Sequence, residues 1–408
     1  MRRTSLLVLF LTVFIDLIGF GMVIPFLAFY AREYGASGIA VGAVVGIYSI
    51  MQFFFAPIWG RLSDRIGRRP VLLISLTASL CGYAMFAFAR SFVLLLLSRL
   101  VAGIGGANIG TAQAYIADST TPENRAKGMG LIGAAFGMGF ILGPPLSAIL
   151  SKVGQDRGLA GNLLPGLAAA GLSAVALTLA FFVLGESKTT AAQIRSRVPP
   201  QFDPKIWRLV RANRALVLIM AALFLTLLAV AGMETTVTLH ARDRFNFRQL
   251  DLAKFFIFMG VIVATIQGGL IGRLAKAFGE KTIAAIGAGS LTLALALLPS
   301  IYRVPLLYAV AFFIAIGQGL TYPSLSSLVT KTTDPSQHGS ILGIAAGIGS
   351  LARFLGPIIA GFLYDLFQAR GAFYGGTFFV FLALMATLRL RSIPLTQPVA
   401  STTPQEAG

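Results

Sequence analysis

Long apolar runs recur along almost the whole of this chain, and they restrict its possible folds more than any other feature. The 408 residues are 56% hydrophobic and only 12% charged, and a helix of about 20 apolar residues crosses a hydrocarbon core of roughly 30 Å. Backbone polar groups inside a bilayer must be paired within the protein, which favours helices. The sequence therefore predicts an all-α membrane protein with twelve transmembrane helices, at approximately 5–30, 39–60, 71–89, 92–118, 127–150, 162–184, 214–240, 250–275, 281–300, 304–330, 338–365 and 370–390.

The charge of the chain is distributed unevenly between alternate connections. The formal net charge is +18, and about two-thirds of the 33 Lys and Arg residues fall in the connections on the side of the N-terminus. This positive-inside bias predicts that both termini are cytoplasmic. Nucleic-acid binding is not expected, because a bilayer would divide the basic residues between its two sides.

A polar, basic stretch over residues 185–213 interrupts the apolar runs and contains three prolines. It predicts a cytoplasmic linker between two six-helix bundles, residues 1–184 and 214–392. The tail at 393–408 has the composition of a disordered segment. Cys81, the only cysteine, lies within the third apolar run and is expected to be buried.

The two predicted bundles share short motifs at a nearly constant offset. Pro335 follows Pro122 by 213 residues, Pro357 follows Pro144 by 213, and GRLAKAFGEK begins at Gly272, 212 residues after GRLSDRIGRR. Such repetition indicates a duplicated unit. Two like-oriented halves that rock around a central cavity are a known plan for transporters.

Three motifs of the first half together resemble those of one family. GRLSDRIGRR matches the GxxxDRxGRR signature of the major facilitator superfamily, through Gly60, Asp64, Arg65, Gly67, Arg68 and Arg69. LSRLVAGIGGA around Arg99 resembles the helix 4 signature of its proton-coupled drug exporters. GFILGPPLSA resembles the helix 5 antiporter signature GxxxGPxxGG, through Gly139, Gly143 and Pro144, with Ser147 and Ala148 in place of the paired glycines.

With FIDLIGFGMVIP around Asp16, the order of motifs is similar to that of twelve-helix drug/proton antiporters, including tetracycline exporters. The resemblance implies the fold of that superfamily, two pseudo-symmetric bundles in a bacterial inner membrane, with the proton as coupling ion and no cofactor. Tetracycline exporters carry an acid in helix 3, whereas the corresponding SLCGYAMF here has none. Tetracycline itself is therefore not the expected substrate.

Charged residues within the apolar runs are the candidates for proton coupling, because such residues are costly in a membrane and mark functional sites. Asp16 lies about 16 Å into the first run, near the midplane, and Arg99 has a compatible depth. The pair is either a proton carrier with its modulator or a static ion pair. Glu234 is the second-half acid, and it is either a cavity acid or a residue of the outer rim, because it lies about 28 Å along its run.

Polar and aromatic residues at helical spacing are candidates for the lining of the substrate cavity. For each of them an ordinary interhelical hydrogen bond is the alternative. The set is Tyr48, Gln52, Gln267, Gln318 and Tyr322. Arg353, within the eleventh run, is a further cavity candidate, and its expected partner is either an anionic substrate group or Glu234.

The loop signature predicts a conformational latch. Asp64 is expected near the start of helix 11, where the positive end of a helix favours an anion, and Arg68 is expected to pair with Asp118. The alternative is a plain loop whose arginines only set topology.

The chain contains no P-loop, no metal-ligand spacing and no nucleophile beside a base, so an enzyme, a metal site and ATP-driven transport are not expected. The sequence predicts a monomeric, proton-coupled secondary active transporter that exports amphipathic or drug-like small molecules. Alternatives are a symporter or flippase for a lipid, a sugar-like or another organic solute, and a membrane receptor that no longer transports.

Overall fold

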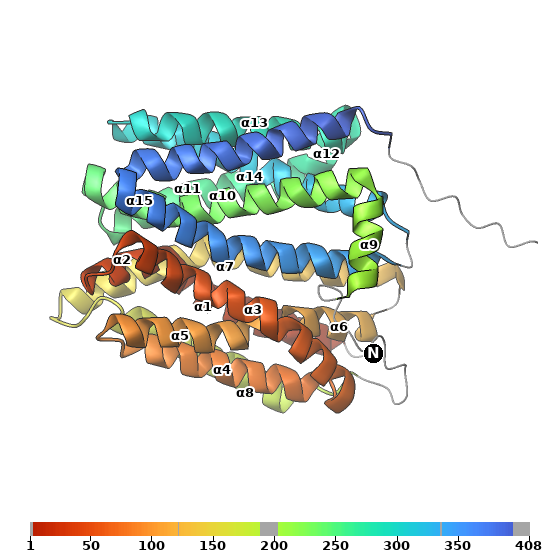
Figure 1. The fold of residues 1–408 in the computed structure, drawn as a ribbon. Coiled ribbons are helices and arrows are strands. Elements are labelled where there is room, and N and C mark those ends of the chain that lie inside the picture. Colours follow the sequence, from red (N-terminus) through yellow and green to blue (C-terminus); the bar gives the residue numbers. More distant parts are fainter. Residues whose placement is uncertain (1–2, 121, 188–202, 335–336, 395–408) are drawn as a thin grey trace, which may run out of the picture.

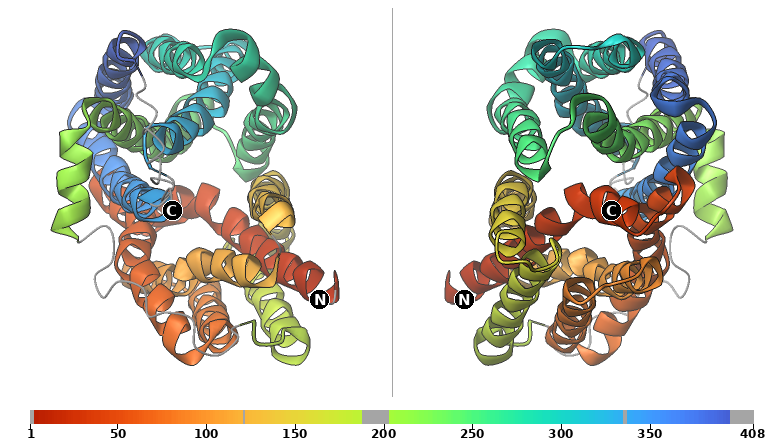
Figure 2. Two further views of the ribbon diagram at one scale, coloured as in Figure 1. Left: turned by 90° about the vertical axis from the view of Figure 1, so that its right-hand side faces the viewer. Right: turned by 90° about the vertical axis from the view of Figure 1, so that its left-hand side faces the viewer.

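The computed structural model describes residues 3–120, 122–187, 203–334 and 337–394, and nearly all of them are helical. The helices form two bundles that lie side by side (Figures 1 and 2). The predicted disordered tail, apart from its first two residues, and most of the predicted linker fall outside the described residues.

The first bundle contains a bent helix at its start and a broken helix in its middle. The 3-10 turns η1 (Ile24–Phe26) and η2 (Gly106–Asn108) mark the two interruptions. Its helices are α1 (Arg3–Val23), α2 (Leu27–Glu33), α3 (Gly38–Ile66), α4 (Arg68–Ala87), α5 (Phe92–Gly105), α6 (Ile109–Ser119), α7 (Pro122–Gln155) and α8 (Leu163–Val183).

The second bundle follows a short helix, α9 (Pro204–Ala212), that lies within the predicted linker. Its elements are α10 (Arg214–Phe245), α11 (Gln249–Thr265), the π-helix η4 (Ile266–Leu270), α12 (Ile271–Phe278), α13 (Glu280–Leu297), the 3-10 turn η5 (Leu298–Ser300), α14 (Val304–Lys331) and α15 (His338–Arg391). Gln368, with φ 56°, breaks α15 at the point where two separate runs were expected.

Nine helices of the described chain are long and apolar enough to cross a membrane, or ten when α1 and α2 are taken as one bent span. The chain is thus a multi-pass integral membrane protein. Cys81 is exposed on α4, so the expectation that it is buried was wrong; it faces outward from the bundle, a position for which a small apolar residue is equally suited when the surroundings are lipid.

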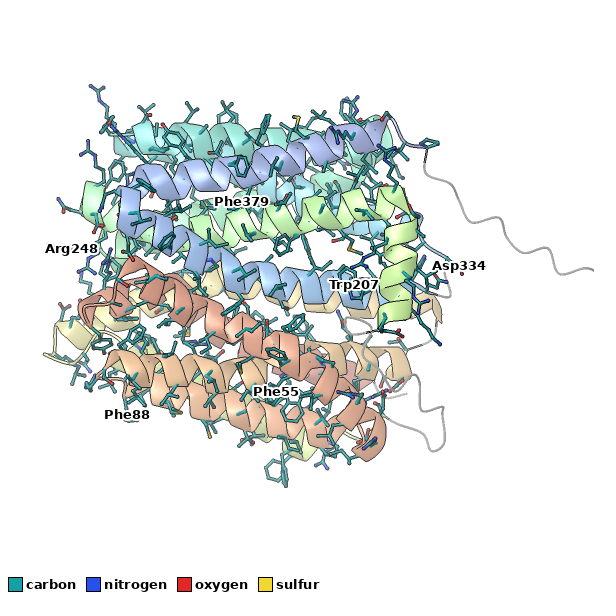
Figure 3. The ribbon with its side chains drawn as sticks, in the orientation of Figure 1. Phe55, Phe88, Trp207, Arg248, Asp334 and Phe379 are labelled. Atoms are coloured by element: carbon teal, nitrogen blue, oxygen red, sulfur yellow. The ribbon has the colours of Figure 1, made fainter. Side chains whose placement is uncertain are left out.

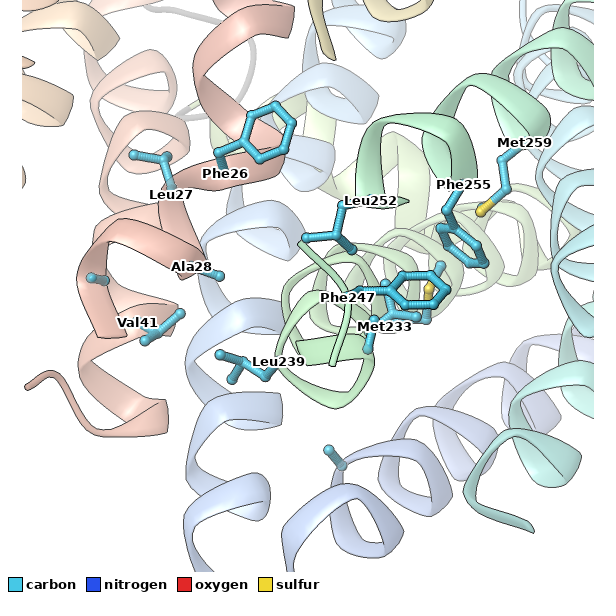
Figure 4. Packing of buried hydrophobic residues seen from close by; sticks show 14 of the residues in the cluster. Phe26, Leu27, Ala28, Val41, Met233, Leu239, Phe247, Leu252, Phe255 and Met259 are labelled. Atoms are coloured by element: carbon cyan, nitrogen blue, oxygen red, sulfur yellow. The ribbon is translucent and has the colours of Figure 1, made fainter. Parts of the chain in front are cut away.

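The two ends of the bundles differ in how they are packed. We call the end with Trp207 and Asp334 the linker end, and the end with Phe88 and Arg248 the far end (Figure 3). At the far end one hydrophobic cluster draws on both bundles, with Phe26 and Val41 from the first and Leu239 and Leu252 from the second (Figure 4).

At the linker end the described residues form separate clusters in each bundle, around Leu72 and Tyr115 in the first and around Leu216 and Leu328 in the second. Burial of apolar surface is what holds packed elements together. The described bundles are therefore joined by a shared core at the far end and have cores of their own at the linker end.

A row of glycines brings the bundles into backbone contact at the far end. Gly38, Gly42 and Gly46 recur every four residues on α3 and face the main chain of α15. A Cβ on Gly46 would lie 2.6 Å from the carbonyl oxygen of Phe354, and one on Gly42 would overlap Pro357. Small residues at this spacing let helices approach closely, and we call this contact the glycine seam.

Candidate functional site

Asp16 lies on α1 inside the first bundle, and only 9% of it is exposed. The side chains of Ser79, Ser173 and Asn108 surround its carboxyl group. One carboxyl oxygen, Oδ1, has no hydrogen-bond partner in the described part of the chain.

The antiporter-like motif of α7 positions the segment of α1 that carries Asp16. A Cβ on Gly139 would lie 2.7 Å from the carbonyl oxygen of Leu17, and a Cβ on Gly143 would overlap the backbone of Gly21. Pro144 follows in the same helix and is buried. The motif therefore packs within its own bundle, against the helix of the buried acid.

Arg99 on α5 is fully buried, and its three guanidinium nitrogens have no hydrogen-bond partner among the described residues. The guanidinium lies 5.4 Å from the ring centroid of Tyr48 and 5.8 Å from that of Tyr83. Cation–π contacts of this kind stabilise a desolvated cation. Among the described residues no carboxylate lies within 4.0 Å of Arg99, so the alternative of a direct Asp16–Arg99 ion pair is not what this structure contains.

Tyr48 lies within electrostatic range of charged residues from both bundles. Its hydroxyl is within electrostatic range of Asp16 and Arg99, and also of Arg353 in the second bundle. Its ring contacts Phe20 at 4.9 Å between centroids. Gln52, one turn later on α3, donates from Nε2 to the carbonyl oxygen of Gly106 at 2.9 Å, which is the interhelical hydrogen bond considered as its alternative.

Glu234 and Arg353 form the charged group of the second bundle. Each lies within electrostatic range of the other. The side chain of Glu234 is exposed and that of Arg353 half-buried. Arg353 also lies within electrostatic range of Tyr48 of the first bundle.

The depth of Glu234 follows from the length of α10. The helix is unbroken and continues to Phe245, where Asn246 caps it in a left-handed conformation. Glu234 therefore lies about 16 Å from that end of the helix, well inside the bundle. The outer-rim alternative was based on a run that ends at residue 240, whereas the helix continues to Phe245; whether Glu234 reaches the cavity stays a prediction. Gly232 causes no break and instead packs against Gly356.

The remaining predicted cavity residues come from α14 and the π-helix η4. Tyr322 is 49% exposed and in electrostatic range of Arg353. Gln318 is half-buried, with its Nε2 unpaired among the described residues. Gln267 is exposed within η4, and single π-helical turns inside α-helices are frequent at functional sites.

The loop signature forms an ion-pair network at the linker end. Arg68 Nε donates to Asp118 Oδ2 at 3.0 Å, which is the pair expected from the sequence, and Arg68 Nη1 contacts Asp64 Oδ1 at 2.5 Å. Gly67 links α3 to α4 with φ 103°. Arg65 is exposed in the last turn of α3, and a Cβ on Gly60 would meet open space. The contact of Asp64 with the start of helix 11 stays a prediction.

Two members of this network were not predicted. Glu186 accepts hydrogen bonds from the backbone N–H groups of Arg68 at 2.8 Å and Arg69 at 3.2 Å, and thereby caps α4. Ser63 Oγ accepts from Arg68 Nη1 at 2.8 Å. Glu186 lies more than a hundred residues away in the sequence, and its only signal was an acid directly after an apolar run.

The second bundle contains an ion pair at the matching place. Glu280, in the first turn of α13, contacts Lys331 of α14 at 2.7 Å and accepts a hydrogen bond from Ser327 at 2.7 Å. Glu280 follows Arg68 by 212 positions, and Lys331 follows Asp118 by 213. The two pairs are related by the internal repeat, with the charges exchanged.

Comparison with known proteins identifies the family. The model described as Major Facilitator Superfamily matches residues 9–301 and 268–407. The chain belongs to the major facilitator superfamily. Within it, major facilitator superfamily domain-containing protein 10 of Mus musculus is 32% identical over 91% of this chain and 90% of its own length. The class C tetracycline resistance protein of Escherichia coli is 31% identical over 89% of this chain and 90% of its own.

Solved structures of the superfamily agree with the fold. The crystal structure of the human organic anion transporter MFSD10 (TETRAN) matches 94% of this chain and 99% of its own, with a TM-score of 0.68 and 26% identity. A bacterial homologue of the human lysosomal transporter Spinster, in an inward-facing and occupied conformation, matches 96% of each chain, with a TM-score of 0.80 and 16% identity. This chain thus has relatives among drug exporters and organic-solute transporters.

Proposed function

We propose that this protein is a proton-coupled secondary active transporter that exports amphipathic, drug-like small molecules by alternating access. The observation that supports this proposal most directly is the place of Asp16. Its carboxyl group is buried within the membrane-spanning bundle, and one of its oxygens has no hydrogen-bond partner among the described residues. Tyr48 lies within range of Asp16 and of the charged group of the opposite bundle. Such an acid gains and loses a proton when its hydration changes, so it can couple proton movement to the state of the cavity.

The packing of the two ends supports one of the two states that alternating access requires. The bundles share a core at the far end and have separate described cores at the linker end, which supports a cavity that opens toward the linker. With twelve spans and both termini in the cytoplasm, as the charge bias predicts, that cavity collects solute from the cytoplasm. Rocking of the bundles then exposes it to the other side.

The second bundle supplies the solute contacts in this scheme. Arg353 is half-buried beside the exposed Tyr322 and Glu234, and guanidinium groups bind carboxylates and phosphates in bidentate fashion. One structural relative is an organic anion transporter. We therefore include solutes with one acidic group among the candidate substrates.

The experiment is gradient-driven transport in proteoliposomes with Asp16→Asn. Wild-type protein is expected to move candidate amphipathic compounds when an inward proton gradient is imposed. Asp16→Asn should reduce that movement at least 100-fold, because an amide cannot carry the proton. Asp156→Asn removes an exposed acid at the far end and should transport normally. Proton-driven accumulation by Asp16→Asn at the wild-type rate would contradict the proposal.

A further inference from the structure

The short helix α9 has two chemically different faces. Val210 is buried, and Ile206 and Trp207 pack with it onto the linker-end core of the second bundle. Lys205, Arg208 and Arg211 recur every third residue on the remaining surface and are exposed, as is Leu209. The packed face fixes the helix to the bundle, and the cationic face points away from it.

The place of α9 relative to the bilayer follows from its neighbour. Only Asn213 separates α9 from α10, which begins at Arg214 and is apolar enough to span the membrane. α9 crosses the direction of α10 and lies at the edge of the bundle, at the linker end (Figures 1 and 2). A helix placed across the end of a spanning helix lies at the level of the lipid headgroups.

The cations of α9 and the first residue of α10 have no acidic partner in the described part of the chain. No ion pair there involves Lys205, Arg208, Arg211 or Arg214. The nearby acid, Asp203, caps α9 by accepting a hydrogen bond from the backbone N–H of Lys205 at 2.9 Å. Three exposed cations of α9, Arg214 at the start of α10 and the exposed Leu209 thus lie at the level of the lipid phosphate groups.

We propose that α9 is a binding site for anionic phospholipid headgroups in the leaflet on the linker side. Lys205, Arg208, Arg211 and Arg214 bind the phosphates, while Leu209 contacts the acyl boundary between them. Basic residues next to a spanning helix are attracted to anionic lipid surfaces, and basic amphipathic helices lie in this layer. The site is independent of the proton-coupling scheme.

Lipid titration tests the proposal on the full chain in detergent. Trp59→Phe leaves Trp207 of α9 as the only tryptophan, so its fluorescence reports binding of short-chain phosphatidylglycerol. Each cation contributes about five-fold in affinity for an anionic surface, and Lys205→Gln/Arg208→Gln/Arg211→Gln in the same background should weaken binding roughly 100-fold. Phosphatidylcholine should bind wild type as weakly as the triple variant binds phosphatidylglycerol.

A matched control removes the same charge from the opposite end. Arg157→Gln/Lys254→Gln/Arg303→Gln neutralises three exposed far-end cations and should bind phosphatidylglycerol like wild type. Equal binding of both lipids by wild type, or undiminished phosphatidylglycerol binding by the α9 variant, would overturn the proposal. An equal response to inorganic phosphate at the same concentration would overturn it too, because it would assign the site to free anions.

Thermal unfolding in nanodiscs covers the case in which the α9 variant is poorly folded in detergent. A ligand that binds only the folded state raises its Tm. Wild type should unfold several degrees higher in nanodiscs with phosphatidylglycerol than in pure phosphatidylcholine, and the α9 variant should lose that difference. A difference that persists in the variant would place the lipid effect elsewhere and refute the proposal.

Discussion

The two ion pairs at the linker end occupy repeat-related positions but carry opposite charges. In the second bundle the acid Glu280 opens α13 and the cation Lys331 closes α14. Acids are favoured at helix N-termini and cations at C-termini, by about 0.3–1 kcal/mol each. This pair therefore agrees with both helix dipoles, and it connects two helices of one bundle.

The pair of the first bundle opposes both dipoles. Arg68 opens α4, and Asp118 lies in the last turn of α6. Glu186, which accepts from the N–H groups of Arg68 and Arg69, supplies the acid that the start of α4 otherwise lacks. The first bundle also adds Asp64 to the pair, whereas Lys276 stands at the repeat-related position. The difference motivates the prediction that the first pair has a role in transport besides the packing of its own bundle.

Neutralising Asp64 should have the largest effect on transport of the substitutions at the two ion pairs. Asp64→Asn is expected to reduce transport at least ten-fold while Tm changes by no more than a few degrees, because Arg68 keeps Asp118 as a partner and an exposed ion pair contributes little to stability. Lys276→Gln, at the repeat-related position, should transport normally. Uptake rates into proteoliposomes, measured at equal protein levels, compare Asp64→Asn and Lys276→Gln with the wild type. Wild-type rates for Asp64→Asn would reduce the loop to a topology signal.

Exchanging the charges of Arg68 and Asp118 should restore stability without restoring transport. Arg68→Glu alone adds a fourth acid to the network of Asp64, Asp118 and Glu186, and we expect a loss of about 1–3 kcal/mol in unfolding free energy. Arg68→Glu/Asp118→Arg should recover most of that loss, because the pair then has the same sense as Glu280 and Lys331. Transport should remain low, since Asp64 then faces another carboxylate in place of its guanidinium partner. Thermal unfolding and uptake together test this; recovery of transport with stability would show that packing is the only role.

The smallest effect is expected in the second bundle. Glu280→Lys/Lys331→Glu keeps the ion pair but reverses it against both dipoles, so unfolding should become easier by about 1 kcal/mol. Transport should stay within two-fold of wild type, because no third acid depends on this pair in the described part of the chain. The Tm in detergent and the uptake rate are the measurements. A ten-fold loss of transport would show that both pairs, and not the first alone, take part in the transport cycle.

The helices themselves could be predicted from the sequence because their cause is local. Each of the twelve apolar ranges is helical over nearly all of its described residues, since a run of that composition has no other way to pair its backbone in a bilayer. Asp16 and Arg99 could be identified because a charge inside such a run is conspicuous. The pairing of Arg68 with Asp118 followed from the resemblance of the loop to a known signature.

The parts that could not be predicted depend on contacts between distant segments or on helix ends. The polar stretch around His240 was taken as the end of a span, but α10 continues to Phe245, before the left-handed Asn246, so the depth of Glu234 along its helix could not be fixed from the sequence. The helix α9 is short, and its stability comes from packing onto the second bundle. The capping of α4 by Glu186 joins residues that are far apart in the first half of the chain.

The glycine seam has a mechanical consequence. Where Gly42 and Gly46 meet α15, main chain touches main chain, so no rotamer has to change there when the surfaces separate or come together again. At Gly38 the backbone N–H donates to the Asp365 side chain at 2.6 Å, and that hydrogen bond must break when the surfaces separate. The two helices can separate as rigid bodies, and their contact leaves no room for even one methyl group. Any side chain larger than hydrogen on that face would hold the two helices apart without altering a charged residue of the cavity.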